Sequence, residues 1–288
     1  MSAATLWRFS RPHTIVGTAL SVAGIYAIAA HELTAPPVYD LVLTLLAALS
    51  VNVFIVGINQ LTDVDIDRVN KPWLPLASGE LTLRQGQVVV AVTGALPLLL
   101  ALTQGPVEVL AVAVALAVGA AYSVPPVRLK RYPALAAASI SLVRAFVVNL
   151  GVYAHFAEGA PIAPAVWALT LFVIPFSLAI AVLKDVPDAE GDRRFAIRTF
   201  TVRFGGRTAF GMGMAALVVA YAGMAVLGFE GADRTVLVVT HLAALALLLV
   251  WAARTDPSDP ARFTTFYMRV WALFFAEYLI VPAAVLSG

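Results

Sequence analysis

Long apolar runs separated by short polar segments fill the chain from end to end. Nine runs of about 17 to 22 residues occur, near the length that a helix needs to cross the hydrocarbon core of a bilayer. The pattern therefore predicts an all-α membrane protein with nine transmembrane helices. The runs cover roughly Thr14 to Ala30, Leu41 to Leu61, Gln87 to Thr103, Pro106 to Tyr122, Pro133 to Ala154, Pro164 to Leu183, Ala209 to Gly228, Thr235 to Ala253 and Met268 to Leu286.

The composition agrees with a membrane protein and excludes other classes. At 61% hydrophobic and 12% charged residues, with a mean hydropathy of +0.89, the chain is too apolar for a soluble domain. We expect a single transmembrane domain over residues 1–288, with no signal peptide in the short segment before the first run. A chain without cysteine forms neither disulfides nor thiolate metal sites. The net charge of +2 indicates no particular partner, and we expect no nucleic acid.

The basic residues are distributed unevenly between the two sides that nine helices define. With the N-terminus in the cytoplasm, all but two of the 19 Lys and Arg residues fall on the cytoplasmic side, as the positive-inside rule requires. The exceptions are Arg234, on the outer side, and Arg144, within a run. We therefore expect an integral membrane protein whose polar functional residues face the cytoplasm.

Two acidic clusters follow the second and sixth runs and so lie on the same side of the membrane. They read Asn59-Gln-Leu-Thr-Asp63-Val-Asp65-Ile-Asp67 and Lys184-Asp185-Val-Pro-Asp188-Ala-Glu190-Gly-Asp192. Carboxylates at membrane depth are costly unless they are paired or bind a cation, so they usually serve a function.

Each acidic cluster belongs to a similar succession of segments: a run ending in acids, a basic loop and a hairpin. This succession occurs near residues 41–122 and again near 164–253. We expect two similar halves, about residues 1–130 and 131–288. Such halves would place the two clusters face to face across a central cavity, as repeats do in other membrane proteins.

Several oxygen-bearing side chains of each cluster share one helix face. Asn59, Asp63 and Asp67 are spaced four residues apart, whereas Asp65 points away. In the second cluster Asp188 and Asp192 have the same spacing, and Pro187 suits the first position of a helix. Asp185 can lie beside these two carboxylates if the helix is interrupted near Val186, while Glu190 lies off the shared face.

Hard oxygen ligands without His or Cys suit Mg²⁺, which usually combines a few carboxylates with substrate phosphates. Two such sites facing each other would hold a diphosphate between them. Alternatively, the acids only cap helices and pair with the adjacent Arg68, Lys71, Arg193 and Arg194. The expected metal ligands are Asn59, Asp63, Asp67, Asp185, Asp188 and Asp192, with Mn²⁺ as a possible substitute for Mg²⁺.

These motifs resemble those of the UbiA superfamily of intramembrane prenyltransferases. The stretch VGINQLTDVDIDRVNKPWLPLASG, residues 56–79, is similar to the homogentisate prenyltransferase branch, including Gln60 where many superfamily members have Asp. Further similar segments lie at residues 7–15, 122–131, 143–151 and 184–194. The resemblance covers essentially the whole chain and implies a nine-helix bundle around a central cavity.

The resemblance implies that a phytyl or geranylgeranyl group passes from its diphosphate to homogentisate with loss of the acceptor carboxylate. This is the chemistry of tocopherol and prenylquinone biosynthesis, which places the protein in a bacterial inner or thylakoid-type membrane. Metal-assisted ionisation would produce an allylic cation, which the electron-rich ring attacks. The residues expected to act in catalysis are Asn59, Asp63, Asp67, Asp188, Asp192 and Tyr122, the last through its ring facing the cation.

Four basic residues beside the clusters are expected to bind the diphosphate and to stabilise it as it leaves. Alternatively, cytoplasmic Lys and Arg residues serve membrane topology alone. The four residues are Lys71, Arg128, Lys130 and Lys184.

Arg144 is the only basic residue within an apolar run, and a charge there usually pairs with a partner or a ligand. It binds the acceptor carboxylate, together with Asn149, or it pairs with Glu277 in the ninth run. Arg11 and His13, at the start of the first run, are further candidates for the acceptor carboxylate.

Two other functions are compatible with these patterns. A related enzyme would use the same donor chemistry with a different acceptor, such as a 4-hydroxybenzoate, a naphthoate or a chlorophyllide. A transporter would also contain intramembrane acids and repeats, although its acids usually lie near the midplane rather than at one face.

Overall fold

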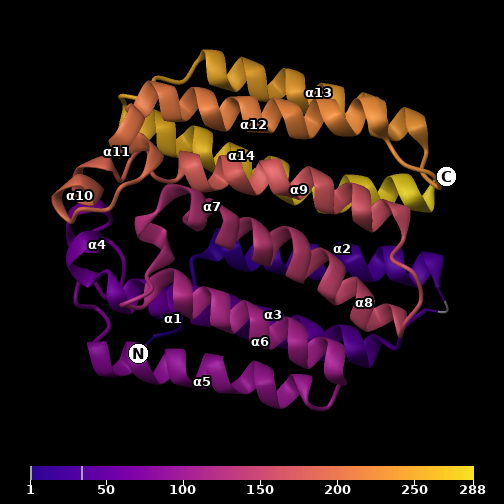
Figure 1. Cartoon of the computed structure of the whole chain (residues 1–288), viewed down its shortest axis with the longest axis horizontal. Helices are drawn as coiled ribbons and strands as arrows, with labels where there is room; N and C mark the ends of the chain where they lie inside the picture. Colours follow the sequence, from indigo (N-terminus) through magenta and orange to yellow (C-terminus); the bar gives the residue numbers. More distant parts are fainter. Residues whose placement is uncertain (1, 34) are drawn as a thin grey trace.

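The computed structural model describes residues 2–33 and 35–288. Within this part of the chain there are no strands, and nine helical stretches are long and apolar enough to cross a membrane. They run side by side as an elongated bundle (Figure 1), and the predicted all-α class is confirmed. The stretches are α2 (Pro12–Glu32), α3 (Val38–Thr62), α5 (Leu83–Ala101), α6 (Pro106–Ser123), the fifth span Pro133–Ala157, α9 (Pro164–Leu183), α12 (Gly206–Leu227), α13 (Arg234–Ala253) and α14 (Pro260–Leu286).

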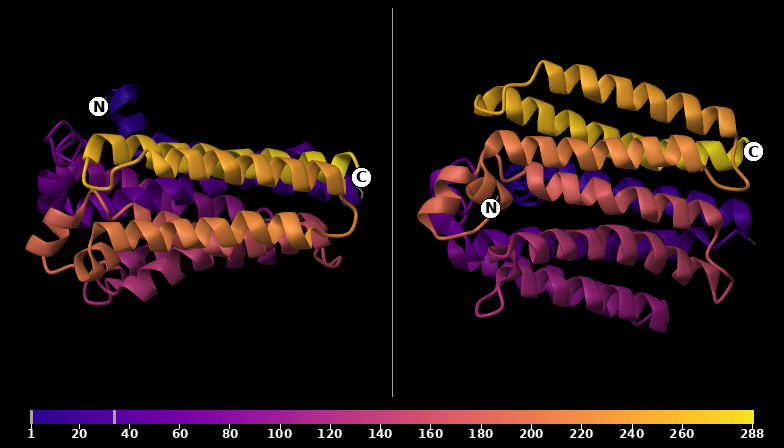
Figure 2. Two further views of the ribbon diagram at one scale, coloured as in Figure 1. Left: turned by 90° about the horizontal axis from the view of Figure 1, so that it is seen from above. Right: turned by 45° about the horizontal axis from the view of Figure 1, so that its top comes forward.

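Short elements gather at one end of the bundle, which we call the polar end because it carries both acidic clusters (Figures 1 and 2). The C-terminus lies at the opposite end (Figure 1), as an odd number of spans requires. The short elements are α1 (Ala3–Phe9), α4 (Val64–Asn70), the 3₁₀ turn η1 (Leu129–Arg131), α10 (Ala189–Arg194) and α11 (Phe200–Phe204).

Proline and capping residues determine where many helices begin. Five spans start with proline, whose missing N–H and restricted φ suit the first helical position. Elsewhere a side-chain oxygen accepts hydrogen bonds from the first free backbone N–H groups, as Asp233 does for Thr235 and Val236 at the start of α13. The five prolines are Pro12, Pro106, Pro133, Pro164 and Pro260.

The ninth span is longer than its apolar run predicted. It begins at Pro260 rather than Met268, because Asp259 caps it by accepting hydrogen bonds from the backbone N–H groups of Ala261 and Arg262. Hydropathy detects only the part of a helix that suits hydrocarbon. The first two turns of α14 include Arg262, Thr264 and Thr265 and lie at the polar end.

The fifth span contains a segment of π-helix that its sequence did not predict. It comprises α7 (Pro133–Ser141), the π-helical η2 (Leu142–Gly151) and α8 (Val152–Ala157). A π-helical turn holds more residues than an α-helical turn and therefore changes the face that following side chains occupy. Both Arg144 and Asn149 lie in η2.

The largest core cluster is built around aromatic side chains of α9, α12 and α14, including Phe172, Phe176, Tyr221 and Phe274. Beside it, α14 packs closely on α2. A Cβ atom at Gly24 of α2 would lie 2.7 Å from the backbone oxygen of Tyr278, so this approach requires a glycine. Small residues commonly allow membrane helices to approach in this way.

The predicted alternative pairing of Arg144 with Glu277 is wrong. The Oε1 atom of Glu277 lies 3.0 Å from Nε2 of His241 on α13, and both side chains are fully buried. The other ring nitrogen of His241 lies 2.7 Å from the backbone oxygen of Leu237, so both nitrogens have partners. In the described residues no ion pair joins Arg144 to an acid, which leaves its guanidinium available for a ligand.

The position of the termini gives a direct test of the span count. Single cysteines placed in this cysteine-free chain as Ser2→Cys and Ser287→Cys should react with an impermeant maleimide from opposite sides of a sealed membrane, because nine spans separate them. Labelling of both cysteines from the same side would contradict the topology.

Candidate active site

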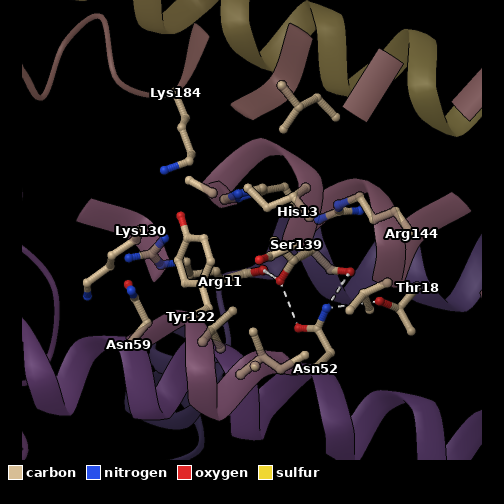
Figure 3. A pocket seen from close by; sticks show the side chains of 18 of the residues that line it. Arg11, His13, Thr18, Asn52, Asn59, Tyr122, Lys130, Ser139, Arg144 and Lys184 are labelled. Atoms are coloured by element: carbon tan, nitrogen blue, oxygen red, sulfur yellow. Dashed lines mark hydrogen bonds between the residues drawn. The ribbon is translucent and has the colours of Figure 1, made fainter. Parts of the chain in front are cut away.

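A cavity of about 530 Å³ lies inside the bundle, enclosed mainly by α2, α3, α6, the fifth span and α14. Figure 3 shows this pocket, with side chains from several of these helices pointing into it. Both acidic clusters line its polar end, while its depth is lined by small apolar residues such as Val51, Val112 and Ala115. The expected central cavity is therefore present, with charge at one end and an apolar interior.

The regular spacing of the first acidic cluster predicted a single continuous helix. The structure instead has an interruption within the cluster. The helix α3 ends at Thr62, Asp63 is not helical, and α4 begins at Val64. The break leaves Asn59, Asp63 and Asp67 on the cavity wall. Asp65 is exposed and pairs with Arg68 over 2.7 Å, so it points away as predicted.

The second cluster has a longer break than expected. A turn over residues 184–188 separates α9 from α10, and Asp188 precedes the first residue of α10. Pro187 is therefore not the first helical residue, because the turn extends through it. Asp185, Asp188 and Asp192 line the cavity, whereas Glu190 is exposed.

Two contacts join the clusters across the cavity mouth. The ammonium group of Lys71 pairs with the carboxylate of Asp188, and the backbone N–H of Gly191 donates a 2.9 Å hydrogen bond to Oδ1 of Asn70. The approach is so close that a Cβ atom at Gly191 would lie 2.3 Å from that oxygen. The predicted face-to-face placement of the clusters is present in the structure.

The other basic residues expected to bind the diphosphate are also paired with acids of the site. Asp63 binds both Lys130 and Arg128, whose Nη2 lies 2.7 Å from Oδ1. Lys184 pairs with its neighbour Asp185 over 2.8 Å. Lys71, Lys130 and Lys184 line the cavity, whereas Arg128 is outside its lining and contacts Asp63 and the backbone oxygen of Thr62.

The carboxylates nevertheless lack full compensation of their charge. Burial, together with the charges of Asp63 and Asp188, raises the pKa of Asp67 to about 6, although Arg11 and Lys71 oppose this. Its Oδ2 atom is buried and has no hydrogen-bond partner. Burial raises the pKa of Asp192 to about 7, with Asp185 and Asp188 as further causes. Burial also lowers the pKa of Lys130 to about 8.

These features make the site suitable for an additional cation. No three His, Asp or Glu side chains within residues 2–33 and 35–288 are close enough to hold a metal by themselves, and Lys71, Lys130 and Lys184 each pair with one of the acids. The unpaired oxygen of Asp67 and the all-oxygen donor set still fit Mg²⁺, which usually shares its coordination with phosphates and water.

The aromatic ring of Tyr122 lies near the charged groups. Tyr122 is in the last turn of α6 and lines the cavity, and Nζ of Lys184 is 5.9 Å from the centre of its ring. A ring at this distance can stabilise a cation through its quadrupole.

Arg144 lies over an aromatic platform on α14. Its Cζ atom is 4.7 Å from the ring centre of Trp271 and 5.5 Å from that of Phe274. The His13 ring contacts Trp271 of the same platform in an edge-to-face arrangement, with the ring centres 4.9 Å apart. Arg11, His13 and Arg144 all line the cavity, so the structure brings these three predicted acceptor residues together.

Asn149 does not belong to this group. It is fully buried outside the cavity lining, and its Oδ1 accepts a 2.7 Å hydrogen bond from the Tyr278 hydroxyl. Asn149 is five residues beyond Arg144 in η2, and its side chain faces Tyr278 of α14 rather than the cavity. Its contact supports α14 rather than a ligand.

The comparisons with known proteins agree with this geometry. The model of the UbiA prenyltransferase family matches residues 18–273. The chain belongs to this family. It is 45% identical to homogentisate phytyltransferase of Synechocystis sp., over 96% of this chain and 94% of that protein. It is 37% identical to the chloroplastic homogentisate solanesyltransferase of Arabidopsis thaliana, over 96% of this chain and 75% of that protein.

Solved structures have the same fold. A UbiA homolog from Archaeoglobus fulgidus bound to GPP and Mg²⁺ superimposes with a TM-score of 0.66 and 24% identity, over 97% of this chain and 99% of that one. The predicted superfamily is confirmed, and the protein is a prenyltransferase. This identification sets aside the alternative of a transporter.

A polar group on the cavity wall was missed in the sequence. Thr14, Thr18 and Asn52 line the cavity, and hydrogen bonds join them (Figure 3). Each is a single polar residue within an apolar run. The sequence contained one indication of this group: Asn52 precedes Asn59 by seven residues, which places both side chains on one face of α3.

The contact between the clusters can be tested at Gly191. The substitution Gly191→Ala should displace α10 from Asn70, lowering both the thermal stability and the rate of prenyl transfer, because the added methyl has no space. In the control Gly211→Ala, on α12, nothing lies within 4 Å of the added atom. That variant should retain activity and stability. Equal behaviour of the two variants would show that the close approach is unimportant.

Proposed function

We propose that the protein transfers a phytyl or geranylgeranyl group from its diphosphate to homogentisate, with loss of the acceptor carboxylate, in tocopherol or prenylquinone biosynthesis. The observation that supports this most directly is the arrangement of the cavity. Two facing acidic clusters lie at its mouth, and an arginine without an acidic partner lies deeper, on an aromatic platform. The first suits a metal-bound diphosphate, and the second suits an aromatic carboxylate.

The donor diphosphate would bind between the clusters with Mg²⁺, for which Mn²⁺ is a possible substitute. When bound, Mg²⁺ neutralises the charge that develops on the leaving diphosphate. The residues that would hold it are Asn59, Asp63 and Asp67 from one cluster and Asp185, Asp188 and Asp192 from the other.

Three lysines would exchange their present partners for the diphosphate. Lys71, Lys130 and Lys184 line the cavity, and each pairs with an acid of the clusters. A diphosphate between the clusters would offer these ammonium groups stronger acceptors. They would then stabilise the leaving group as the carbon–oxygen bond breaks. Arg128 would act by holding Asp63 in position rather than by touching the diphosphate.

The isoprenoid tail would occupy the apolar depth of the cavity, and its allylic carbon would lie near Tyr122. The ring of Tyr122 would stabilise the allylic cation as it already accommodates the ammonium of Lys184. The apolar walls exclude water, which would otherwise capture the cation.

The acceptor would bind with its carboxylate at Arg144, where Arg11 and His13 contribute further donors. Its ring would approach the allylic carbon from the side of Trp271. After the diphosphate has departed, the ring carbon would form a bond to the allylic carbon of the cation. The attacked ring carbon then loses its proton, and the methylene carbon that loses carbon dioxide gains one.

The orientation of the site follows from charge. The polar end carries most of the basic residues, which the positive-inside rule assigns to the cytoplasmic side. We propose that both substrates reach the site from that face of a bacterial inner or thylakoid-type membrane.

The central test is transfer by the purified protein in lipid nanodiscs. Homogentisate with phytyl or geranylgeranyl diphosphate and Mg²⁺ should yield the prenylated, decarboxylated product, and a chelator should abolish it. Single substitutions of four cavity carboxylates by asparagine should remove most turnover, because each removes an anionic ligand. They should also remove the thermal stabilisation that Mg²⁺ with inorganic diphosphate produces. The four are Asp63, Asp67, Asp188 and Asp192.

The matched control is Asp65→Asn, which changes an exposed carboxylate of the same segment. It should leave turnover and thermal stabilisation intact. Transfer that continues in chelator would contradict the metal assignment, and transfer to a 4-hydroxybenzoate or naphthoate but not to homogentisate would contradict the acceptor.

A second test concerns Arg144. A guanidinium that binds a carboxylate through two parallel hydrogen bonds cannot be replaced well by lysine. Arg144→Lys should therefore raise the KM for homogentisate by roughly tenfold, a loss of about 1.4 kcal/mol. The KM for the prenyl diphosphate should stay nearly unchanged. An unaltered homogentisate KM would instead favour Arg11 and His13 as the carboxylate site.

A further inference from the structure

The polar group formed by Thr14, Thr18 and Asn52 has no role in the mechanism above, although it lies on the wall of the same cavity. It joins α2 to α3 within the membrane-spanning part of the bundle. Polar side chains in such a place are costly unless their hydrogen bonds are complete. The hydrogen bonds of this group are incomplete at two atoms.

The amide of Asn52 has a defined orientation. Its Nδ2 atom lies 3.3 Å from the backbone oxygen of Thr14 and 2.9 Å from Oγ1 of Thr18. Because a backbone carbonyl only accepts hydrogen bonds, the nitrogen must face it, and both hydrogens of the amide are used. The oxygen Oδ1 therefore faces the Thr14 hydroxyl, 2.9 Å away.

That oxygen is only partly satisfied. The Thr14 hydroxyl has a single hydrogen, but it also lies 2.9 Å from the backbone oxygen of Arg11 and 3.2 Å from that of Ser10. Since one hydrogen serves three acceptors, Oδ1 of Asn52 shares it and keeps a free lone pair. Asn52 is partly exposed to the cavity, so a ligand can reach this atom.

The Thr18 hydroxyl supplies the complementary atom. Its oxygen accepts the hydrogen bond from Asn52, and within the described residues its own hydrogen is donated to no partner. Thr18 also lines the cavity. The wall thus presents one acceptor and one donor side by side, which is the pattern that a single hydroxyl group on a ligand would complete.

We propose that Asn52 and Thr18 form a binding site for a phenolic hydroxyl of the acceptor. The phenol donates its hydrogen to Oδ1 of Asn52, and its oxygen accepts the hydrogen of Thr18. This inference rests on the function proposed above, because it takes the acceptor to be a phenol with a carboxylate.

The location suits such a ligand. Thr14, which contacts Asn52, is adjacent in sequence to His13, and the His13 ring is 4.9 Å from Trp271 beneath Arg144. In Figure 3 Asn52 and Thr18 appear toward the side of Arg144 and His13, away from Asn59 and Lys130. Seven residues of helix separate Asn52 from Asn59, which is about 10 Å. The acceptor would therefore lie deeper than the diphosphate.

Two contacts at separate points of the acceptor would determine which ring carbon is prenylated. Arg144 holds the carboxylate and the Asn52–Thr18 pair holds the hydroxyl, so the ring has a single orientation toward the allylic carbon. The hydrogen bond to Asn52 also increases electron density on the phenol oxygen, which makes the ring more nucleophilic. An acceptor without the hydroxyl would leave these wall atoms unpaired and bind poorly.

The test compares two variants with three acceptors. Thr18→Val and Asn52→Leu each remove one hydrogen-bonding side chain at similar size. The acceptors are homogentisate, 2-hydroxyphenylacetate and 3-hydroxyphenylacetate, and each of the latter two lacks one hydroxyl. The control is Thr44→Val on α3, which removes a 2.9 Å hydrogen bond to Gln104 outside the cavity lining.

Each cavity variant should raise the homogentisate KM by roughly tenfold, about 1.4 kcal/mol, and leave the KM of the donor diphosphate unchanged. Of the two monohydroxy acceptors, one lacks the hydroxyl that the pair binds. That acceptor should be a poor substrate for the wild type, and its KM should not rise further in the variants. The control should behave as the wild type with all three acceptors.

Two results would overturn the inference. An unchanged homogentisate KM in both variants would show that the pair does not bind the acceptor. Equal losses with all three acceptors would show that the pair only joins α2 to α3. If Asn52→Leu does not fold, Thr18→Val decides alone, since it preserves shape. Wild-type protein that transfers nothing to homogentisate would refute the proposed function, whereas wild-type transfer with unaltered variants refutes the hydroxyl site only.

Discussion

The structure depends on the compensation of buried charge at one end of an apolar bundle. Carboxylates from two distant parts of the chain meet there, where Lys71 pairs with Asp188 of the other cluster and Lys130 pairs with Asp63. In a region of low dielectric these interactions are much stronger than in water. They hold the loop after α3 against the loop after α9 and so define the mouth of the cavity. In the function proposed for the protein, these charges would become available as a metal-bound diphosphate takes over the lysine contacts.

The cavity changes in character with depth. Its mouth is ionic, its next layer contains Arg144 over the rings of Trp271 and Phe274, and its interior is lined by small aliphatic residues. This order matches the parts of the two substrates: a diphosphate, an aromatic acid and an isoprenoid tail. Helix packing maintains it, because α2 contacts α14 closely at Gly24 and α14 carries the aromatic platform.

Much of the fold could be predicted from the chain itself. Nine apolar runs and the distribution of basic residues specify the number of spans. The thickness of the bilayer determines the length of a span, and basic residues gather on its cytoplasmic side. The residue types of the two clusters also indicated an oxygen-ligand site, since carboxylates are costly in a membrane. The approximate ends of helices followed from prolines, while the start of α14 did not, because hydropathy does not detect polar helical turns.

The sequence by itself therefore determined the span count, the family and the identity of the acidic and basic residues at the mouth of the cavity. Only the tertiary structure decided which of them meet. It paired Glu277 with His241 rather than with Arg144, directed Asn149 to Tyr278 rather than to the cavity, and brought Asn52 to Thr14 and Thr18. The physical reason is that spacing along a helix defines a face, whereas the partner of that face depends on how separate helices pack.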